Sequence, residues 1–124
     1  MMRISFSKRF LKDLKRLSKK QALVRRDVDN FIATLSQDEH PGDRLQGTGD
    51  QIIYKARLGI SGSNKGKSAG YRVIYWIYTA DGIVLLTMYA KSERSDISAN
   101  DVNDIVAEAK IDFSAEDNDE PDNQ

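Results

Sequence analysis

The sequence of 124 residues contains no cysteine and a single histidine, His40. Without cysteine the chain has no disulfide, no thiol nucleophile and no cysteine-ligated zinc, and one histidine excludes a metal site built on two. Most histidine-centred acid–base chemistry is excluded as well. An enzyme of this composition would work with lysine, arginine, tyrosine and carboxylate side chains, or with a borrowed cofactor.

Long apolar runs are also absent. The longest, Ile83–Ala90, is far shorter than the ~18 residues that a membrane-spanning helix needs. The N-terminus carries charges but lacks the apolar segment of a signal peptide. We therefore expect a cytoplasmic protein with no membrane partner. The length and the apolar content of 40% are those of one soluble domain with a single core.

The net charge of zero is an average over two unlike parts of the chain. Residues 1–95 hold 18 basic and nine acidic side chains, a charge of +9, whereas residues 96–124 hold one lysine and ten acids, a charge of −9. A basic body of this kind favours a polyanionic partner. The alternative is an ordinary solvated surface followed by an acidic tail that aids solubility.

The N-terminal third of the chain predicts a strand and a helical hairpin. Arg3–Phe6 is typical of a short strand, and Ser7 can cap the helix that follows. A second amphipathic helix follows a break at Lys19 and Lys20. Apolar residues recur at helical spacing in both helices: Phe10, Leu11, Leu14 and Leu17 in the first, and Val24, Val28, Phe31, Ile32 and Leu35 in the second.

Three strands follow. Ile52–Leu58 is the first, Tyr71–Thr79 is rich in aromatic and β-branched residues, and Ile83–Lys91 returns after a turn at Asp81-Gly82. The near-continuous hydrophobicity of the last two predicts central strands that are buried on both faces. A strand meander after a helical hairpin makes a mainly antiparallel sheet with helices mainly on one face.

A third helix begins at Ser98, whose spacing to Asp101 resembles a capping box. The predicted order is β-α-α-β-β-β-α, an α+β fold. We expect one domain over residues 1–113. Residues 114–124 are acidic, contain a proline and have no large apolar side chain, so we expect that tail to be disordered.

Charged side chains stand where the hydrophobic pattern of the strands breaks. Alternation puts Lys55 and Arg57 on one face of their strand, and a meander brings Arg72, at the start of the next strand, close to Tyr89 and Lys91 at the end of the last. Four cations and a phenol would thus meet in one patch, which suits a phosphate. The alternative is solvated charge at the edge of a sheet.

The loop Gly59–Gly70 contains four glycines and the cations Lys65 and Lys67. Gly66-Lys67-Ser68 is not a P-loop, because position 61 is a serine and a strand follows instead of a helix. A flexible basic loop that touches RNA backbone is one interpretation. A long hairpin loop without a role is the other.

Three stretches of the chain resemble the RelE/ParE toxin superfamily, and more closely its RelE/HigB-like branch. They are YKARL at 54–58, GYRVIYWI at 70–77 and LLTMYAKSERSDIS at 85–98, within a similarity that covers about residues 3–110. The resemblance implies a toxin of a type II toxin–antitoxin pair, an endoribonuclease that cleaves messenger RNA on the ribosome without a metal or another cofactor. It also implies a cognate antitoxin, through which alone the toxin would contact operator DNA.

The same resemblance assigns roles to residues. Lys55 and Arg57 match the family's basic pair, Arg72 matches the arginine at the start of the next strand, and Lys91 and Arg94 lie in its Lys-x-Glu-Arg-Ser segment. We expect catalysis from Arg72, Lys55, Arg57, Tyr89 and Lys91, and RNA binding from Arg94, Lys65 and Lys67.

This chain departs from the RelE pattern at two positions, where Ser92 replaces an arginine and Ser98 a tyrosine. The proton acceptor therefore stays unassigned. Two other functions also stay open: a ParE-like toxin directed at DNA gyrase, and a non-catalytic corepressor or binding module acting with an antitoxin. Convergent cations favour the nuclease, because a gyrase binder does not need them.

Overall fold

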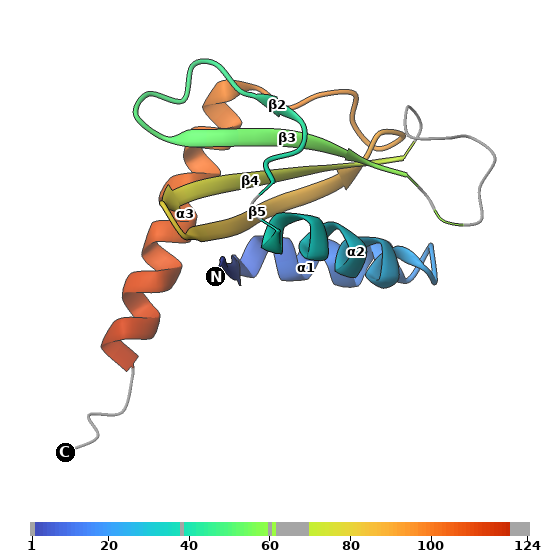
Figure 1. The fold of residues 1–124 in the computed structure, drawn as a ribbon, viewed down its shortest axis with the longest axis horizontal. Helices are drawn as coiled ribbons and strands as arrows, with labels where there is room; N and C mark the ends of the chain where they lie inside the picture. Colours follow the sequence, from blue (N-terminus) through green and yellow to red (C-terminus); the bar gives the residue numbers. More distant parts are fainter. Residues whose placement is uncertain (1, 38, 60, 62–69, 120–124) are drawn as a thin grey trace.

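The computed structural model describes residues 2–37, 39–59, 61 and 70–119, with side chains up to residue 113. These residues form three helices and a five-stranded sheet, an α+β fold as predicted (Figure 1). The elements are β1 (Arg3–Phe6), α1 (Lys8–Ser18), α2 (Val24–Ser36), β2 (Asp43–Arg44), β3 (Ile52–Leu58), β4 (Tyr71–Thr79), β5 (Gly82–Ala90) and α3 (Ala99–Asp119).

The sheet is mixed, with the strand order β1-β5-β4-β3-β2. The meander β3-β4-β5 and the pair β2-β3 are antiparallel, as predicted, while β1 lies parallel to β5. Parallel strands need a long connection between them, and here the helical hairpin and the rest of the meander lie between β1 and β5 in the chain. The two-residue strand β2 is a finding that the sequence pattern does not predict.

Both faces of the sheet are covered (Figure 1). On one face α1 and α2 pack through Phe10 and Phe31 against side chains such as Tyr75. On the other face α3 packs through Val102 and Val106. This confirms that β4 and β5 are central strands buried on both sides. The helices are divided two to one between the faces.

Two serines begin helices, as predicted. The Ser7 hydroxyl accepts a hydrogen bond from the Phe10 amide at 3.0 Å, which caps α1. The Ser98 hydroxyl accepts one from the Asp101 amide at 3.1 Å at the start of α3. Each bond satisfies an amide of the first helical turn that has no partner within the helix.

The third helix is longer than expected. It continues to Asp119, past the boundary at residue 113 where disorder was expected to begin. Ala115 and Glu116 are good helix formers, and the first proline is Pro121, so nothing in the sequence stops the helix earlier. The domain boundary at residue 113 and the disorder of the tail stay predictions, and residues 120–124 lie outside the described part of the chain.

The turn before β2 depends on glycine, and this yields a stability prediction. Gly42 has a φ of +98°, and a Cβ there would lie 2.2 Å from the Lys55 carbonyl oxygen. Gly49 has a φ of +62° but open space around it, so it is a matched control. We expect Gly49→Ala to cost about 1 kcal/mol of unfolding free energy and Gly42→Ala at least about 1 kcal/mol more, from the added clash. Urea denaturation measures both, and equal costs would contradict the prediction.

Candidate active site

The register of the meander places three chemically active side chains in one row. Arg57 of β3 lies opposite Arg72 of β4, and Arg72 lies opposite Tyr89 of β5. Cross-strand partners share a face of the sheet. Lys55, two residues before Arg57, lies on the same face by alternation. The structure thus brings together side chains that the sequence pattern predicted to meet.

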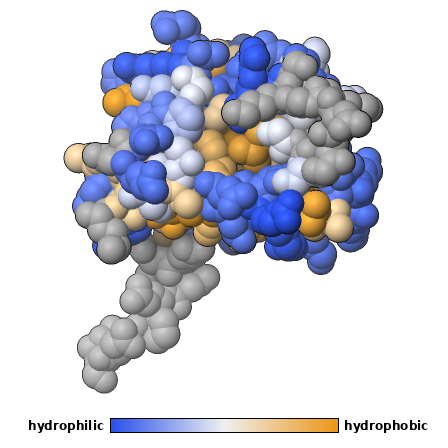
Figure 2. Space-filling view, turned by 45° about the vertical axis from the view of Figure 1, so that its right-hand side comes forward, coloured by the Kyte–Doolittle hydropathy of each residue, from blue (hydrophilic) through white to orange (hydrophobic). Residues whose placement is uncertain are grey.

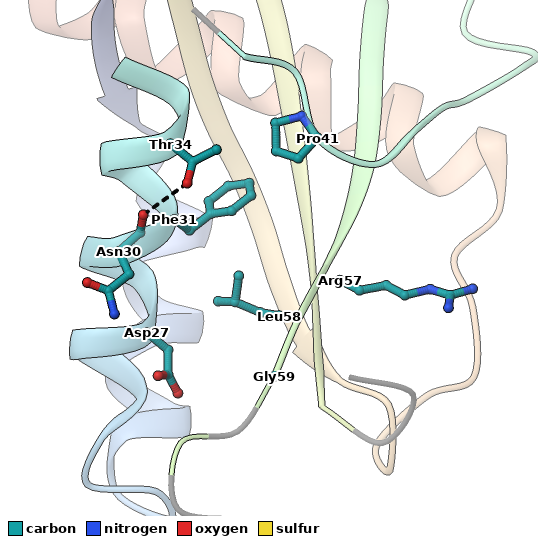
Figure 3. A pocket seen from close by; sticks show the side chains of 8 residues that line it. All are labelled: Asp27, Asn30, Phe31, Thr34, Pro41, Arg57, Leu58 and Gly59. Carbon is teal, nitrogen blue, oxygen red and sulfur yellow. Dashed lines mark hydrogen bonds between the residues drawn. The ribbon is translucent and has the colours of Figure 1, made fainter. Parts of the chain in front are cut away.

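The row lies on the sheet face opposite the helical hairpin. In Figure 3 the Arg57 side chain points away from Phe31 of α2, whereas Leu58 points toward the helix. Tyr89 packs in the same apolar cluster as Val102 of α3. The candidate site is therefore on the α3 side of the sheet, at the end where β3 finishes and β4 begins.

Arg72 is the most deeply placed cation of the site. Only 4% of its surface is exposed, and its guanidinium donates a hydrogen bond to the Tyr71 carbonyl at 3.2 Å. Arg57, its neighbour on β3, is exposed. One arginine is thus fixed by its surroundings while the other reaches solvent, and together they offer forked donors to an anion.

Tyr89 is buried next to these cations. The Arg94 guanidinium lies 5.4 Å from the centre of its ring, a cation–π contact. Burial raises the pKa of Tyr89, the nearby Asp96 carboxylate raises it further, and Arg94 and Arg72 act in the opposite direction. Among the residues that the structure describes, the Tyr89 hydroxyl has no hydrogen-bond partner. This phenol is therefore protonated at neutral pH, and its hydroxyl is buried beside the cations.

Asp96 is a member of the site that sequence reasoning missed. Its Oδ1 atom accepts hydrogen bonds from Lys55 Nζ at 2.7 Å and from the Ile97 amide at 2.8 Å. These bonds, together with the charges of Lys55 and Lys91, lower the pKa of Asp96. The only signal in the sequence was the position of Asp96 in the segment 91–96, where acidic and basic residues alternate.

The remaining predicted residues have different outcomes. Lys91 is exposed just after β5, and its charge acts on Asp96, so it borders the cluster. Arg94 contacts Tyr89, and its guanidinium also donates to the Asp96 carbonyl at 3.1 Å and to the Asp101 carboxylate at 3.2 Å. Lys65 and Lys67 lie outside the described residues.

Two hollows lie beside β3. One, of about 500 Å3, is lined by Pro41, Gly42, Asp43, Lys55, Ala56 and Arg57. It adjoins the side chains of Lys55, Arg57 and Arg72, which we call the cation row. Its volume is in the range of ligand pockets, about 300–1,000 Å3. Figure 2 shows one face of the whole molecule, on which apolar surface is exposed at the centre between hydrophilic residues.

The second hollow, of about 300 Å3, lies between α2 and β3 and is drawn in Figure 3. Asp27 lies at its edge, and its carboxylate accepts hydrogen bonds from the amide of Ser61, at 3.1 Å, and from the hydroxyl of the same residue. The guanidinium of Arg57 points away from this hollow. This second hollow is therefore separate from the cation row.

Chemically, the site offers positive charge and a phenol to one anion. Two guanidinium groups suit the oxygens of a phosphate, and they stabilise charge that develops there in a transition state. A lysine held by a carboxylate and a protonated tyrosine are groups able to carry protons.

Comparison with known proteins identifies the family of the chain. The family model described as the RelE toxin of the RelE/RelB toxin–antitoxin system matches residues 2–120. The chain belongs to the RelE toxin family. A solved structure of a copper-bound mutant toxin from Helicobacter pylori is also similar, at 19% identity over 75% of this chain and 98% of that chain, with a TM-score of 0.48.

Within the described part of this RelE family chain, no helix is long and apolar enough to cross a membrane. In the same residues, no three side chains of histidine, cysteine, aspartate or glutamate are grouped so that they could hold a metal ion.

The electrostatics of the site give a pH prediction. Asp96→Asn removes a negative charge that disfavours the Tyr89 phenolate, so the pKa of Tyr89 should fall. Asp101→Asn is the matched control, because Asp101 pairs with Arg94 and does not contribute to the shift of Tyr89. NMR titration of tyrosine labelled at Cζ measures the pKa. A rise or no change in the Asp96 variant would contradict the assignment.

Proposed function

We propose that this RelE family protein is an endoribonuclease that cleaves messenger RNA on the ribosome and thereby inhibits translation. The substrate supplies its own nucleophile, the 2′-hydroxyl next to the scissile phosphate. The enzyme then has to align that hydroxyl, remove its proton, stabilise the added charge on the phosphate and protonate the leaving 5′-oxygen. None of these tasks requires a metal or another cofactor.

The roles follow from position and charge. Arg72 and Arg57 stabilise the charge on the phosphate oxygens in the transition state. Lys55 and Lys91 hold the phosphate or move protons, while Tyr89 stacks on a base or acts in proton transfer. The products are a 2′,3′-cyclic phosphate and a 5′-hydroxyl, since the 2′-oxygen forms a bond to phosphorus as the 5′-oxygen leaves.

One observation carries the proposal: two arginines face each other across β3 and β4, with a buried tyrosine next in the row. Two guanidinium groups side by side on one face of a sheet suit the oxygens of a single phosphate. The charge of +9 over residues 1–95 is suited to attracting a polyanion. Membership of a toxin family supports the proposed activity.

The proposal includes specific partners. The ribosome presents the message, and a cognate antitoxin binds and inhibits the protein. Operator DNA is contacted only through that antitoxin. Arg94, with its guanidinium over Tyr89, and Lys65 and Lys67 contribute to holding the RNA. All of these partners are found in the cytoplasm, where the protein would act.

Arg57→Ala is the sharpest test, because the side chain is exposed and its loss does not disturb the core. We expect the single-turnover rate of cleavage on programmed ribosomes to fall about 100-fold, as when one group that stabilises transition-state charge is removed. Arg25→Ala, which replaces an exposed arginine of α2, is the matched control and should cleave normally.

Arg72→Ala should abolish growth arrest while circular dichroism shows an intact fold.

Mapping of 5′ ends after induced expression identifies the activity. Cuts phased with codons on translated messages, and absent from untranslated ones, are the expected result. Intact RNA together with stalled replication would contradict the proposal and favour the gyrase-directed alternative.

A further inference from the structure

Strand β5 contains an irregularity just before the candidate site. Tyr75 pairs with Leu85, but the preceding residue, Ile74, pairs with Thr87, so that Leu86 is an extra residue on β5. This two-against-one arrangement is a β-bulge, a feature that re-aims the side chains beyond it.

The bulge decides which face of the sheet Tyr89 occupies. Leu85 packs in the core of the helical hairpin, and strict alternation from Leu85 would send Tyr89 to that same side. An unbroken register would also pair Met88 with Arg72. Instead Tyr89 pairs with Arg72 and packs in the α3 cluster. Because of the extra residue, the side chain beside Arg72 is that of Tyr89 and not that of Met88.

The bulge is held from outside the strand. The pairing of β1 with β5 ends at Leu85, and Ser7 continues it. The Ser7 amide donates to the Leu85 carbonyl at 3.1 Å, and its hydroxyl donates to the Leu86 carbonyl at 2.7 Å. Two consecutive carbonyls therefore bond to the same residue, whereas in a regular strand they point in opposite directions.

Asp13 of α1 holds the other side of the bulge. One carboxylate oxygen, Oδ2, accepts hydrogen bonds from the Thr87 hydroxyl at 2.5 Å and from the Met88 amide at 3.1 Å. The side chain of Asp13 is only 15% exposed. A carboxylate thus takes the place of a neighbouring strand beside the extra residue Leu86, where the pairing of β4 with β5 shifts between Ile74 and Tyr75.

We propose that Asp13 is a positioning residue for the active site and acts through the β5 bulge to direct Tyr89 toward Arg72. The inference rests on the proposed function, because it gives the tyrosine a part in RNA cleavage. Asp13 does not belong to the cation row and lies on α1, so it acts through the strand and not on the substrate. Without it the Met88 amide lacks its acceptor, and the strand is free to relax toward the regular register.

The test is a double-mutant cycle of Asp13→Ala and Tyr89→Phe, measured as single-turnover cleavage on programmed ribosomes. Loss of proton-transfer help from one group typically costs about 100-fold in rate, so we expect a loss of at least about tenfold from each single change. Asp13→Ala should add little in the Tyr89→Phe background. Additive losses would overturn the proposal, as would wild-type rates in Asp13→Ala.

Control variants separate positioning from general stability. Arg16→Ala removes the ion pairs that Arg16 makes with Asp13 and Glu93 but leaves the bulge contacts of Asp13, and it should cleave normally. Val28→Ala destabilises the same core from α2 and should also cleave normally once folded. Asp13→Asn retains an oxygen for the Met88 amide and should cleave faster than Asp13→Ala. Slow cleavage by Val28→Ala would overturn the proposal.

A structural readout keeps this inference separate from the proposed function. In the wild-type protein, an NMR cross-relaxation signal should join the Tyr89 ring to the Arg94 side chain, and Asp13→Ala should weaken or remove it. An unchanged signal would overturn the role of Asp13 even where cleavage falls. If the wild-type protein cleaves no RNA, the proposed function fails, and this signal still decides whether Asp13 directs the tyrosine.

Discussion

The backbone register of β3, β4 and β5 is the constraint on which the site depends. It fixes Arg57, Arg72 and Tyr89 as successive cross-strand partners, so their distances follow from hydrogen bonds between strands and not from flexible loops. A site built on paired strands is held more precisely than one built on loops, and orientation of reacting groups contributes strongly to rate. The same register is fixed by the apolar side chains that alternate between two cores, so folding and assembly of the site are one event.

This arrangement has a cost that the rest of the structure offsets. Two opposed arginines repel each other, and burial of Arg72 removes water from one of them. Apolar packing on both faces of β4 and β5 supplies the compensating stability. The Asp96 carboxylate accepts a hydrogen bond from Lys55 and another from the amide of Ile97, which is buried in the α3 core. Lys55 and Arg72 are thus held in position before any substrate binds.

Much of this structure could be predicted from the sequence. The strands 52–58 and 71–79 agree with the predicted bounds, because the alternation of the first, the dense aromatic and β-branched residues of the second and the nearby glycines are strong local signals. The meeting of Lys55, Arg57, Arg72 and Tyr89 followed from strand alternation. The parallel pairing of β1, the strand β2 and the partners of Asp96 could not be predicted, because they depend on contacts between distant segments. The bulge was hidden for the same reason, since Ser7 and Asp13 meet β5 only in the folded chain.

The central claim is that one ribonucleotide linkage sits on the row of Arg57, Arg72 and Tyr89. The most direct measurement is an experimental structure of the protein on a ribosome whose message carries a 2′-methoxy group at the cleavage position, which blocks the reaction. The account predicts the scissile phosphate within hydrogen-bond distance of both guanidinium groups, with Tyr89 against the same nucleotide. A message bound instead over the helical hairpin, with the α3 side of the sheet empty, would contradict it.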